Sequence, residues 1–420
     1  MKTVAVPLKS LDAALAELLA FAHVLPDAER VSTFDADARV LAQDVVSALQ
    51  VPPQDNSAMD GYALRFSDVP QAGVVLPVTQ RIPAGSSGTA LQPGTAARIF
   101  TGAPIPNGAD AVVMQEDCEA VDDTAAAGDK QLPFPSVRFN KIPRLGQNIR
   151  RAGEDVTMDS VVLPKGRRLT PAALGLAASV GLAELSVARR PRVALFSTGD
   201  ELVMPGDVAP QDMKPGAIFN SNRFFQRALL VRLGCTVSDL GIVPDRLDAT
   251  IDTLREASLA HDLVLTCGGV SVGEEDHVRP AVLALGQLDM WQLAIKPGKP
   301  FAYGRVGAAH FIGLPGNPVS SLVTFMVLVR PFLLRLQGVR DVAPRAVMLR
   351  ADFAWPRPDR RREFLRVQHN ASGGLDLFAN QSSGVLTSAV WGDGLVDTAP
   401  GVAITPGDMV RFLSFADLMA

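Results

Sequence analysis

Three segments of the chain combine glycines with carboxylates in a pattern suited to phosphate chemistry. Each follows an apolar run typical of a buried strand, and the segments are 197–201, 241–245 and 268–276. Backbone N–H groups of glycines cradle anions at close approach, and carboxylates beside phosphates commonly hold Mg²⁺ through oxygen. The segments predict a Mg²⁺-assisted site for a phosphate ester or anhydride. One such turn alone often serves only chain geometry, whereas three together favour a site.

The elements that position these segments lie between Arg192 and about Gly338, where predicted strands and helices alternate. Apolar strands are separated by amphipathic helices, one capped by Asn220 or Ser221 and another covering 247–258. Strand–helix alternation predicts a parallel sheet with right-handed crossovers. Ligands of such sheets bind beyond the carboxyl ends of the strands. We therefore expect the three segments to lie along one edge of one sheet.

Two familiar nucleotide motifs are missing from this region. GGVSVG has the glycine spacing of a P-loop, but Glu274 and Glu275 stand where the motif needs Lys and Ser or Thr. The dinucleotide pattern G-x-G-x-x-G is also absent. ATP-driven and NAD-dependent reactions are therefore disfavoured.

A lysine pair and a helix start offer two further anion sites. Lys296 and Lys299 flank a Pro-Gly turn that fixes their directions, which suits a phosphate or a tetrahedral oxyanion. Asn317 is placed to cap a helix with Ser320 in its first turn. The alternatives, two solvated lysines and a simple helix cap, remain open on these residues alone.

Composition excludes several classes of protein. The chain has 420 residues, 47% of them hydrophobic, and a net charge of −4, so it is globular and has no general attraction for nucleic acid or anionic lipid. Three cysteines are too few for a disulfide framework and indicate a reducing compartment. The longest apolar run, Val319 to Val329, has 11 residues and is too short to span a membrane. A cytoplasmic protein is expected.

The remaining chain changes character several times. Residues 1–50 favour helices, including a second amphipathic stretch from about Ser32 to Leu49. Residues 51–140 alternate Pro and Gly turns with short β-branched runs, which predicts a small β-domain. Thr170 and Pro171 open another helix, and the last 80 residues favour β structure again.

Seven strings resemble the molybdopterin molybdenumtransferase family, the family of MoeA and the gephyrin E-domain. They occur in the family's order and cover nearly the whole chain. The strings are DNSAMDGYA (55–63), RIFTGAPIPNGADAVVMQED (98–117), NIRRAGEDV (148–156), FSTGDEL (196–202), GGVSVGEEDH (268–277), AIKPGKPFAYG (294–304) and GLPGNPVSSL (313–322).

The resemblance implies a multidomain fold of α/β plus β class, an elongated subunit of four domains. Residues 1–50 and 141–190 would form a discontinuous α+β domain, and 51–140 an inserted β-domain. Residues 191–338 would form an α/β molybdopterin-binding domain around a parallel sheet, and 339–420 a C-terminal β-barrel. Family members are homodimers whose active site lies between the α/β domain of one chain and the inserted domain of the other.

The implied reaction transfers molybdenum from molybdate to adenylylated molybdopterin and releases AMP, with Mg²⁺ as cofactor. Of the matching catalytic positions, Glu201, Asp245 and Asp276 are assigned to Mg²⁺. The full catalytic set is Asp60, Thr101, Glu201, Asp245, Asp276, Lys296 and Lys299. The substrate-binding set is Ser197, Thr198, Gly199, Asp200, Gly268, Gly269, Ser271, Gly273, Ser320, Arg366 and Ser383.

Two other functions fit part of the resemblance. A molybdopterin adenylyltransferase shares the α/β domain but does not need the inserted and C-terminal domains. A non-catalytic pterin-binding scaffold does not need the acids or Lys296 and Lys299. The implied partners of the enzyme are a second copy of the chain, the upstream adenylyltransferase and downstream molybdoenzymes, with neither nucleic acid nor membrane among them.

Overall fold

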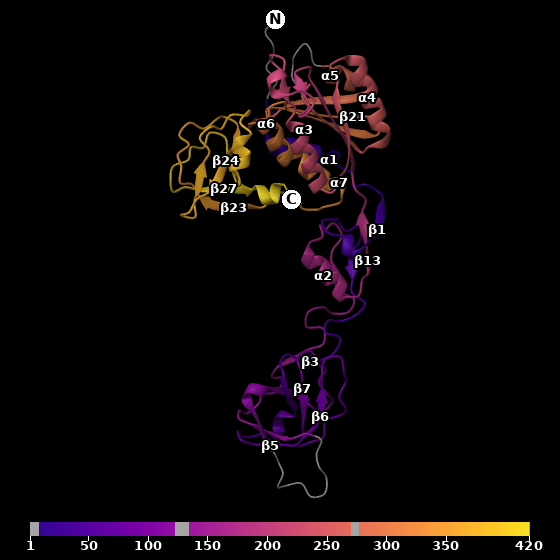
Figure 1. Cartoon of the computed structure of the whole chain (residues 1–420), viewed down its shortest axis with the longest axis vertical. Helices are drawn as coiled ribbons and strands as arrows, with labels where there is room; N and C mark the ends of the chain where they lie inside the picture. The colour runs from indigo at the N-terminus through magenta and orange to yellow at the C-terminus, as the bar shows by residue number, and fades with distance from the viewer. Residues whose placement is uncertain (1–7, 122–133, 270–276, 420) are drawn as a thin grey trace.

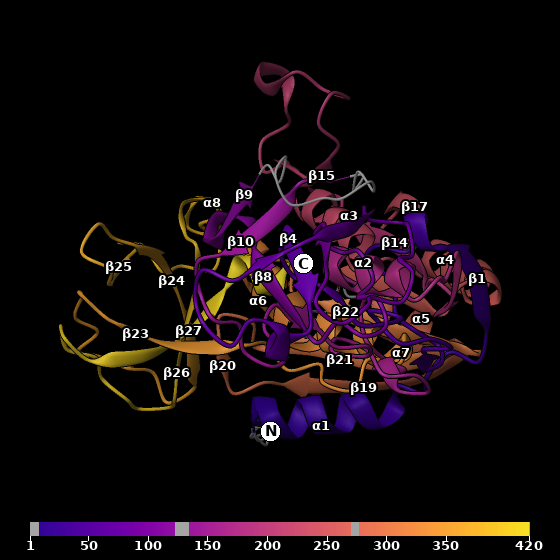
Figure 2. The same ribbon diagram turned by 90° about the horizontal axis from the view of Figure 1, so that it is seen from below.

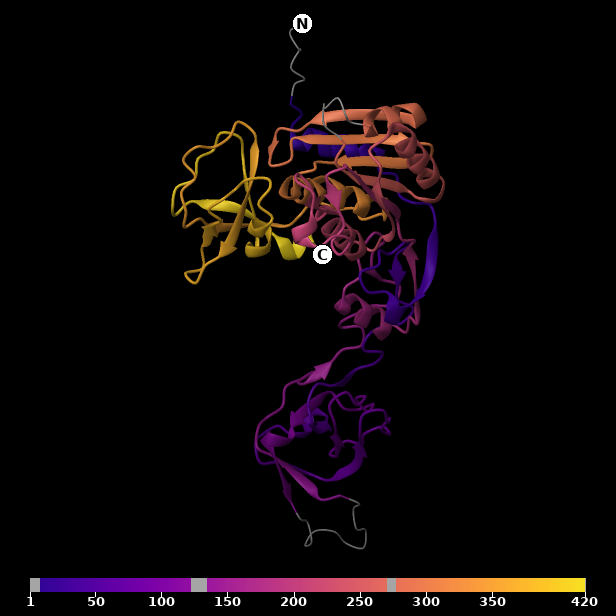
Figure 3. The same ribbon diagram turned by 45° about the horizontal axis from the view of Figure 1, so that its top comes forward.

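The computed structural model describes residues 8–121, 134–269 and 277–419, which form an elongated molecule (Figure 1). An α/β domain and a C-terminal β-domain lie side by side at one end. A narrow domain leads from them to the inserted β-domain at the far end, and the tilted view shows the same separation (Figure 3). The predicted multidomain combination of α/β and β structure is confirmed.

The α/β domain is built on a six-stranded sheet of order β17-β14-β18-β22-β21-β19. The first four strands in this order pair in parallel, and the last two pair antiparallel. Cys267 pairs with both Ser197 and Leu314, so three strands end level at one edge. The strands are β14 (Arg192–Thr198), β17 (Thr236–Val243), β18 (Leu263–Cys267), β19 (Gly286–Gln292), β21 (Pro300–Val306) and β22 (Ala309–Leu314).

Helices cover both faces of this sheet. Leu195 packs with α1, α3 and α7 on one face, and its neighbour Phe196 packs with α4 and α5 on the other, because side chains alternate along a strand. Helix α1 therefore packs on the α/β domain, although its residues precede those of the narrow domain. The helices are α1 (Leu11–Phe21), α3 (Asn222–Arg232), α4 (Leu247–Ala260), α5 (Val278–Leu285), α6 (Pro318–Thr324) and α7 (Arg330–Leu336).

Helices α6 and α7 are continuous through a π-helical stretch, η5 (Phe325–Val329). Within the described residues this 19-residue helix, Pro318–Leu336, is the one long and apolar enough to cross a membrane. Most of it is buried in the α/β core, where an apolar helix is needed for packing.

The narrow domain joins segments from both sides of the inserted domain. The predicted helix from about Ser32 to Leu49 is wrong: a short 3₁₀ turn, η1 (Thr33–Asp35), is followed by extended chain. Leu41 bridges to Val187, so this segment fills a small core by strand pairing. The paired strands are β1 (Ala28–Ser32) with β13 (Glu184–Ala188) and β2 (Val45–Val46) with β12 (Val161–Leu163), and α2 (Pro171–Ser179) packs beside them. A further pair, β3 (Asn56–Ser57) with β11 (Ile149–Arg150), lies where the chain enters and leaves the inserted domain (Figure 1).

The inserted domain contains two small sheets, of order β6-β7-β4-β8 and β5-β10-β9. Buried apolar side chains fill both faces of the larger sheet. The strands are β4 (Gly61–Leu64), β5 (Val75–Leu76), β6 (Val78–Ile82), β7 (Ala96–Ile99), β8 (Ala111–Met114), β9 (Cys118–Val121) and β10 (Ser136–Phe139), with turns η2 (Phe66–Asp68) and η3 (Gln115–Asp117).

The C-terminal domain is built on a sheet of order β20-β24-β26-β27-β23, with β25 also paired to β24. Its edge strand β20 is contributed by the α/β domain, from the chain between β19 and β21. A bridge between Ala351 and Leu375 brings the end of β23 back to β25. The sheet lies to one side of the α/β domain, and the segment between β15 and β16 projects away from it (Figure 2). The elements are β20 (Ile295–Lys296), β23 (Ala346–Arg350), β24 (Arg362–His369), β25 (Leu375–Leu377), α8 (Thr387–Trp391), β26 (Gly394–Thr398), β27 (Met409–Ser414) and α9 (Phe415–Leu418); β15 (Leu202–Val203), η4 (Pro210–Asp212) and β16 (Ile218–Phe219) belong to the projection.

Candidate active site

A cavity of about 660 Å³ lies at the carboxyl ends of β14, β18 and β22. Five predicted site residues line it: Ser197, Thr198, Glu201, Gly268 and Ser320. The remaining wall comes from β15 and β16, the connection between β16 and α3, Cys267, the turn before α6, Pro300 and, from the C-terminal domain, Gly384. The sheet edge that the sequence predicts as the binding edge is therefore hollowed.

Buried polar atoms without partners stand in this wall. Ser197 Oγ, Asn220 Nδ2 and Asn222 Oδ1 are buried and have no hydrogen-bond partner among the described residues. The Asn222 amide nitrogen is fixed, because it donates to the carbonyl of Gly316 at 2.6 Å and to Cys267 Sγ at 3.0 Å. An unpaired buried polar atom costs about 1–3 kcal/mol. A polar ligand in the cavity would recover that cost.

Asn220 and Asn222 were not predicted as site residues. Of the two predicted caps, Ser221 stands at the N-cap of α3 without a side-chain cap bond, and the side-chain oxygen of Asn220 accepts from the Arg223 N–H at 3.3 Å. This bond leaves the amide nitrogen of Asn220 unpaired. The signal in the sequence was an Asn-Ser-Asn string between a strand and a helix, which capping alone also explains.

The Cys267 thiol lines the cavity as a neutral group. It donates to the carbonyl of Pro315 at 3.2 Å, and burial raises its pKa above the usual value. A protonated thiol is a poor nucleophile. Cys267 therefore contributes shape and a weak hydrogen bond to the wall.

Of the three carboxylates assigned to Mg²⁺, Glu201 alone lines the cavity as described. Gly199 has a φ of +137°, and a Cβ there would lie 2.5 Å from a Glu201 carboxylate oxygen, so glycine permits this placement. Asp245 follows β17, and Asp276 lies outside the described residues together with Ser271 and Gly273. The described part of the chain holds no group of three His, Cys, Asp or Glu fit for a metal.

The remaining predicted glycines and acid lie close to this edge. Gly269 follows Gly268 with a φ of +64°, and Asp200 is exposed beside Glu201. A Cβ at Gly269 would clash with Val278 of α5. Glycine is therefore required at Gly269 by packing, whether or not it contacts a ligand.

The lysine turn reaches the edge of the cavity. Lys299 is exposed directly before Pro300 of the wall, and Gly298, with a φ of +110°, packs against Thr324 of α6. Lys296 Nζ lies 3.1 Å from a Glu363 oxygen and 3.5 Å from an Asp359 oxygen. The charge of Lys296 is therefore shared with two carboxylates of the C-terminal domain.

Arg366 is buried away from the cavity wall. Its guanidinium donates to Ser388 Oγ at 3.1 Å and to the carbonyls of Phe364 and Ser382 at 3.0 and 3.3 Å. Burial without a carboxylate partner lowers its pKa to about 10. The carbonyl of Ser383 accepts from the Val319 N–H at 2.9 Å, so the loop that Arg366 holds reaches the start of α6.

Asp60 and Thr101 lie together in the inserted domain. One Asp60 oxygen accepts from the Thr101 backbone N–H at 2.8 Å and from its hydroxyl at 2.7 Å. These two bonds lower the pKa of Asp60. Within one chain the inserted domain lies far from the α/β domain, so the fold does not bring this pair to the cavity (Figure 1).

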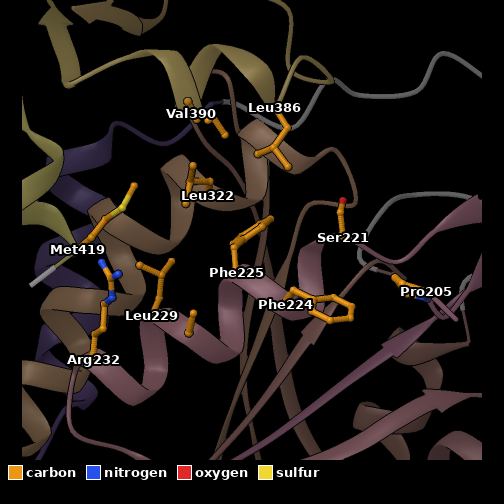
Figure 4. A pocket seen from close by; sticks show the side chains of 12 residues that line it. Pro205, Ser221, Phe224, Phe225, Leu229, Arg232, Leu322, Leu386, Val390 and Met419 are labelled. Atoms are coloured by element: carbon orange, nitrogen blue, oxygen red, sulfur yellow. The ribbon is translucent and has the colours of Figure 1, made fainter.

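A second, apolar pocket of about 590 Å³ adjoins the cavity and shares Ser221 with it (Figure 4). Phe224, Phe225 and Leu322 line one side from α3 and α6, and Val390 and Met419 line the other from the C-terminal domain. The sequence did not predict this pocket, because its walls come from segments far apart in the chain.

The comparisons with known families agree with this architecture. Residues 194–335 match a probable molybdopterin-binding domain. Residues 9–181 match the MoeA N-terminal region of domains I and II, and 348–415 match the MoeA C-terminal region, domain IV. The α/β sheet with its polar cavity therefore places the protein in the class with a molybdopterin-binding domain.

Proteins of similar sequence and structure identify the family within this class. Molybdopterin molybdenumtransferase of Haemophilus influenzae is 43% identical over 79% of this chain and 78% of its own. The protein of that name from Synechococcus elongatus is 37% identical over 91% and 93%. A structure of the MoeA protein from Pyrococcus horikoshii covers 97% of this chain and 100% of its own, with a TM-score of 0.81 and 27% identity. The chain belongs to the molybdopterin molybdenumtransferase family.

Proposed function

We propose that this protein transfers molybdenum from molybdate to the dithiolene sulfurs of adenylylated molybdopterin and releases AMP. The polar cavity at the strand ends carries this proposal, because its unpartnered Ser197, Asn220 and Asn222 atoms suit a ligand rich in hydrogen-bonding groups. The names of the relatives support the same reaction class.

Glu201, Asp245 and Asp276 are the proposed acids of this site. Glu201 borders the cavity, which supports its contact with substrate phosphate. Mg²⁺ would be held by these carboxylates together with phosphate oxygens, and it would neutralise negative charge on the diphosphate link. The glycine N–H groups of Gly199, Gly268 and Gly269 would hold the same phosphates, together with Ser271 and Gly273, which lie outside the described residues.

Lys299 and Ser320 are the proposed first contacts of the molybdate dianion. Ser320 is in the first turn of the 19-residue helix and lines the cavity, where the helix dipole favours an anion. Lys299 is exposed at the cavity edge and supplies a point charge. Three residues would act from the side of the C-terminal domain. Lys296 would fix the lysine turn, and Arg366 and Ser383 would fix the loop around Gly384.

Asp60 and Thr101 would join the site from a second copy of the chain. Their distance from the cavity within one chain supports a homodimer in which the inserted domain of one copy faces the α/β domain of the other. Phe34 supports the same pairing, because its side chain is 97% exposed beside an apolar hollow lined by Leu174, Gly175 and Ala178 of α2. Together the exposed ring and the apolar hollow form a patch of the kind that interaction surfaces carry.

The three cysteines are free thiols, which supports a reducing, cytoplasmic location. There the enzyme would receive adenylylated pterin from an adenylyltransferase and deliver its product to molybdoenzymes. The C-terminal domain disfavours the adenylyltransferase alternative, because Gly384 of that domain forms part of the cavity wall. An adenylyltransferase built on the α/β domain alone would lack that wall.

Molybdate-dependent release of AMP from adenylylated molybdopterin tests the function. We expect AMP and a molybdenum-loaded pterin to form with Mg²⁺ and molybdate, and little AMP to form without molybdate. Tight pterin binding without AMP release in either condition would indicate a scaffold. Formation of adenylylated pterin from ATP would indicate an adenylyltransferase.

A further inference from the structure

The inserted domain carries two arginines and two aromatic rings close together, which we call the arginine platform (Arg81, Arg98, Tyr62 and Phe100). Three of them lie on neighbouring strands, and Phe100 directly follows β7. Arg81 of β6 stands opposite Arg98 of β7 in the parallel register. Arg98 in turn stands opposite Tyr62 of β4. Side chains opposite one another on paired strands share a face, so the three form one row across the sheet.

Aromatic rings hold both guanidinium groups in place. The guanidinium carbons of Arg81 and Arg98 each lie 4.6 Å from the centre of the Phe100 ring. The Arg98 guanidinium also lies 5.2 Å from the centre of the Tyr62 ring. Stacking on an aromatic face stabilises a guanidinium while leaving its N–H edges for other partners. The row is therefore a preorganised pair of cations.

The charge of this pair is not balanced by an ion pair within the described residues. Arg98 donates to two neutral acceptors, the Gly61 carbonyl at 2.9 Å and Gln115 Oε1 at 2.5 Å. Arg81 is exposed, and its guanidinium stacks on Phe100 without an ion pair to any described residue. Like charges on opposite strand residues destabilise a sheet. An anion bound between the two arginines would offset this repulsion and would explain why they are held side by side.

The platform adjoins the predicted catalytic pair. Gly61, the acceptor for Arg98, directly follows Asp60, and Thr101 directly follows Phe100. A group bound to both arginines would therefore lie beside the Asp60 carboxylate. Tetrahedral phosphate oxygens match the fork of a guanidinium.

We propose that Arg81 and Arg98 form a phosphate-binding site for the diphosphate link of the adenylylated pterin. The proposal rests on the proposed function, in which the inserted domain of one copy faces the cavity of the other. The diphosphate is then held between the glycine segments of one copy and the arginine platform of the second. Arg81 and Arg98 become substrate-binding residues that place the phosphates beside Asp60.

Arg81→Met tests the site, because methionine keeps a side chain on Phe100 and removes the charge. Arg138→Met is the matched control: Arg138 is an exposed arginine of the same domain, on β10, paired with Glu119 at 3.6 Å. We expect Arg81→Met to raise the KM for adenylylated molybdopterin about ten-fold or more, as for a lost charge-assisted contact. The KM for molybdate should change less than about two-fold, and the melting temperature should stay equal or rise. Arg138→Met should match the wild type.

Calorimetric titration with inorganic pyrophosphate separates this proposal from the proposed function, since binding needs no turnover. Weaker pyrophosphate binding by Arg81→Met than by Arg138→Met supports the platform even if the wild type releases no AMP. Wild-type turnover with an unchanged KM in Arg81→Met would overturn the platform and leave the proposed function intact. A lower melting temperature of Arg81→Met with unchanged pyrophosphate binding would also overturn the platform, because Arg81 would then stabilise the fold and not bind phosphate.

Discussion

Lys296 Nζ lies 3.1 Å from Oε1 of Glu363, and this ion pair joins the α/β domain to the C-terminal domain beside the cavity. The Glu363 side chain is 1% exposed, and its other oxygen accepts from Trp355 Nε1 and the Asp359 N–H, both at 2.8 Å. The backbone enforces the pair, because Lys296 and Glu363 are register partners of β20 and β24. Lys296 therefore neutralises a buried carboxylate in addition to any role toward molybdate.

Lys296→Ala should destabilise the C-terminal domain more than the double variant Lys296→Ala/Glu363→Gln does. The single change leaves a buried carboxylate without its lysine, which costs about 3–5 kcal/mol in a fully buried pair and roughly 2 kcal/mol here, because Lys296 is partly exposed. Urea unfolding followed by Trp fluorescence measures the difference. Equal stability of the two variants would show that the pair contributes nothing to the junction.

Glu201→Gln should abolish turnover without weakening the fold. Glu201 is exposed at the cavity and packs against no core cluster, so its charge is not needed for folding. We expect AMP release to fall at least about 100-fold, with a melting temperature within about one degree of the wild type. Asp212→Asn, an exposed acid in the projecting segment, is the control. Undiminished AMP release would remove Glu201 from the catalytic set.

The sequence predicted the part of the site that local pattern determines. A buried strand followed by glycine and a polar residue places Ser197, Thr198 and Gly268 at one edge, and the cavity is there. Ser320 follows from its place in the first turn of a helix. The position of these residues at the edge could be predicted because strand periodicity and sheet direction set where the chain leaves the sheet. Their role in binding stays a prediction.

Other features depend on contacts between distant segments. The pairing of Lys296 with Glu363 spans two domains, and the spacing of the lysine turn contains no sign of it. The burial of Arg366 could not be predicted either, because arginine is usually exposed and the residues that bury Arg366 are distant in the sequence. Leu41 and its neighbours were expected in a helix because their spacing suits one, but tertiary pairing with Val187 decides their conformation.

Phe34→Asp should convert a dimer into a monomer. The exposed ring lies beside the hollow of α2, and a carboxylate there would oppose burial against a second copy. Sedimentation should give twice the 44.5 kDa chain mass for the wild type and the chain mass for the variant. Leu259→Asp, a similar change at an 85% exposed leucine of α4, is the control and should stay dimeric. Dissociation of both variants, or of neither, would place the interface elsewhere.

Asp262 should make stability depend on acid pH. Burial disfavours its charge, but hydrogen bonds from Arg189 and from the backbone and side chain of Arg192 outweigh burial and lower its pKa from 3.8 to about 2. Because the folded pKa is the lower one, the stabilisation is complete above pH 3.8 and is lost as the pH falls toward 2. We expect Asp262→Asn to lose about 1–2 kcal/mol at pH 6 and little at pH 2.5. Urea titrations at both values test this, and an equal loss at both would contradict the linkage.

Each active site should combine the cavity of one copy of the chain with the Asp60–Thr101 pair of another. Mixing Asp60→Ala with Glu201→Gln after dissociation and reassociation tests it most directly. Each variant alone should release almost no AMP, whereas random mixed dimers contain one intact site and should recover roughly a quarter of wild-type activity. Activity that stays at the level of the separate variants, with mixed dimers demonstrated by differential tags, would contradict a shared site.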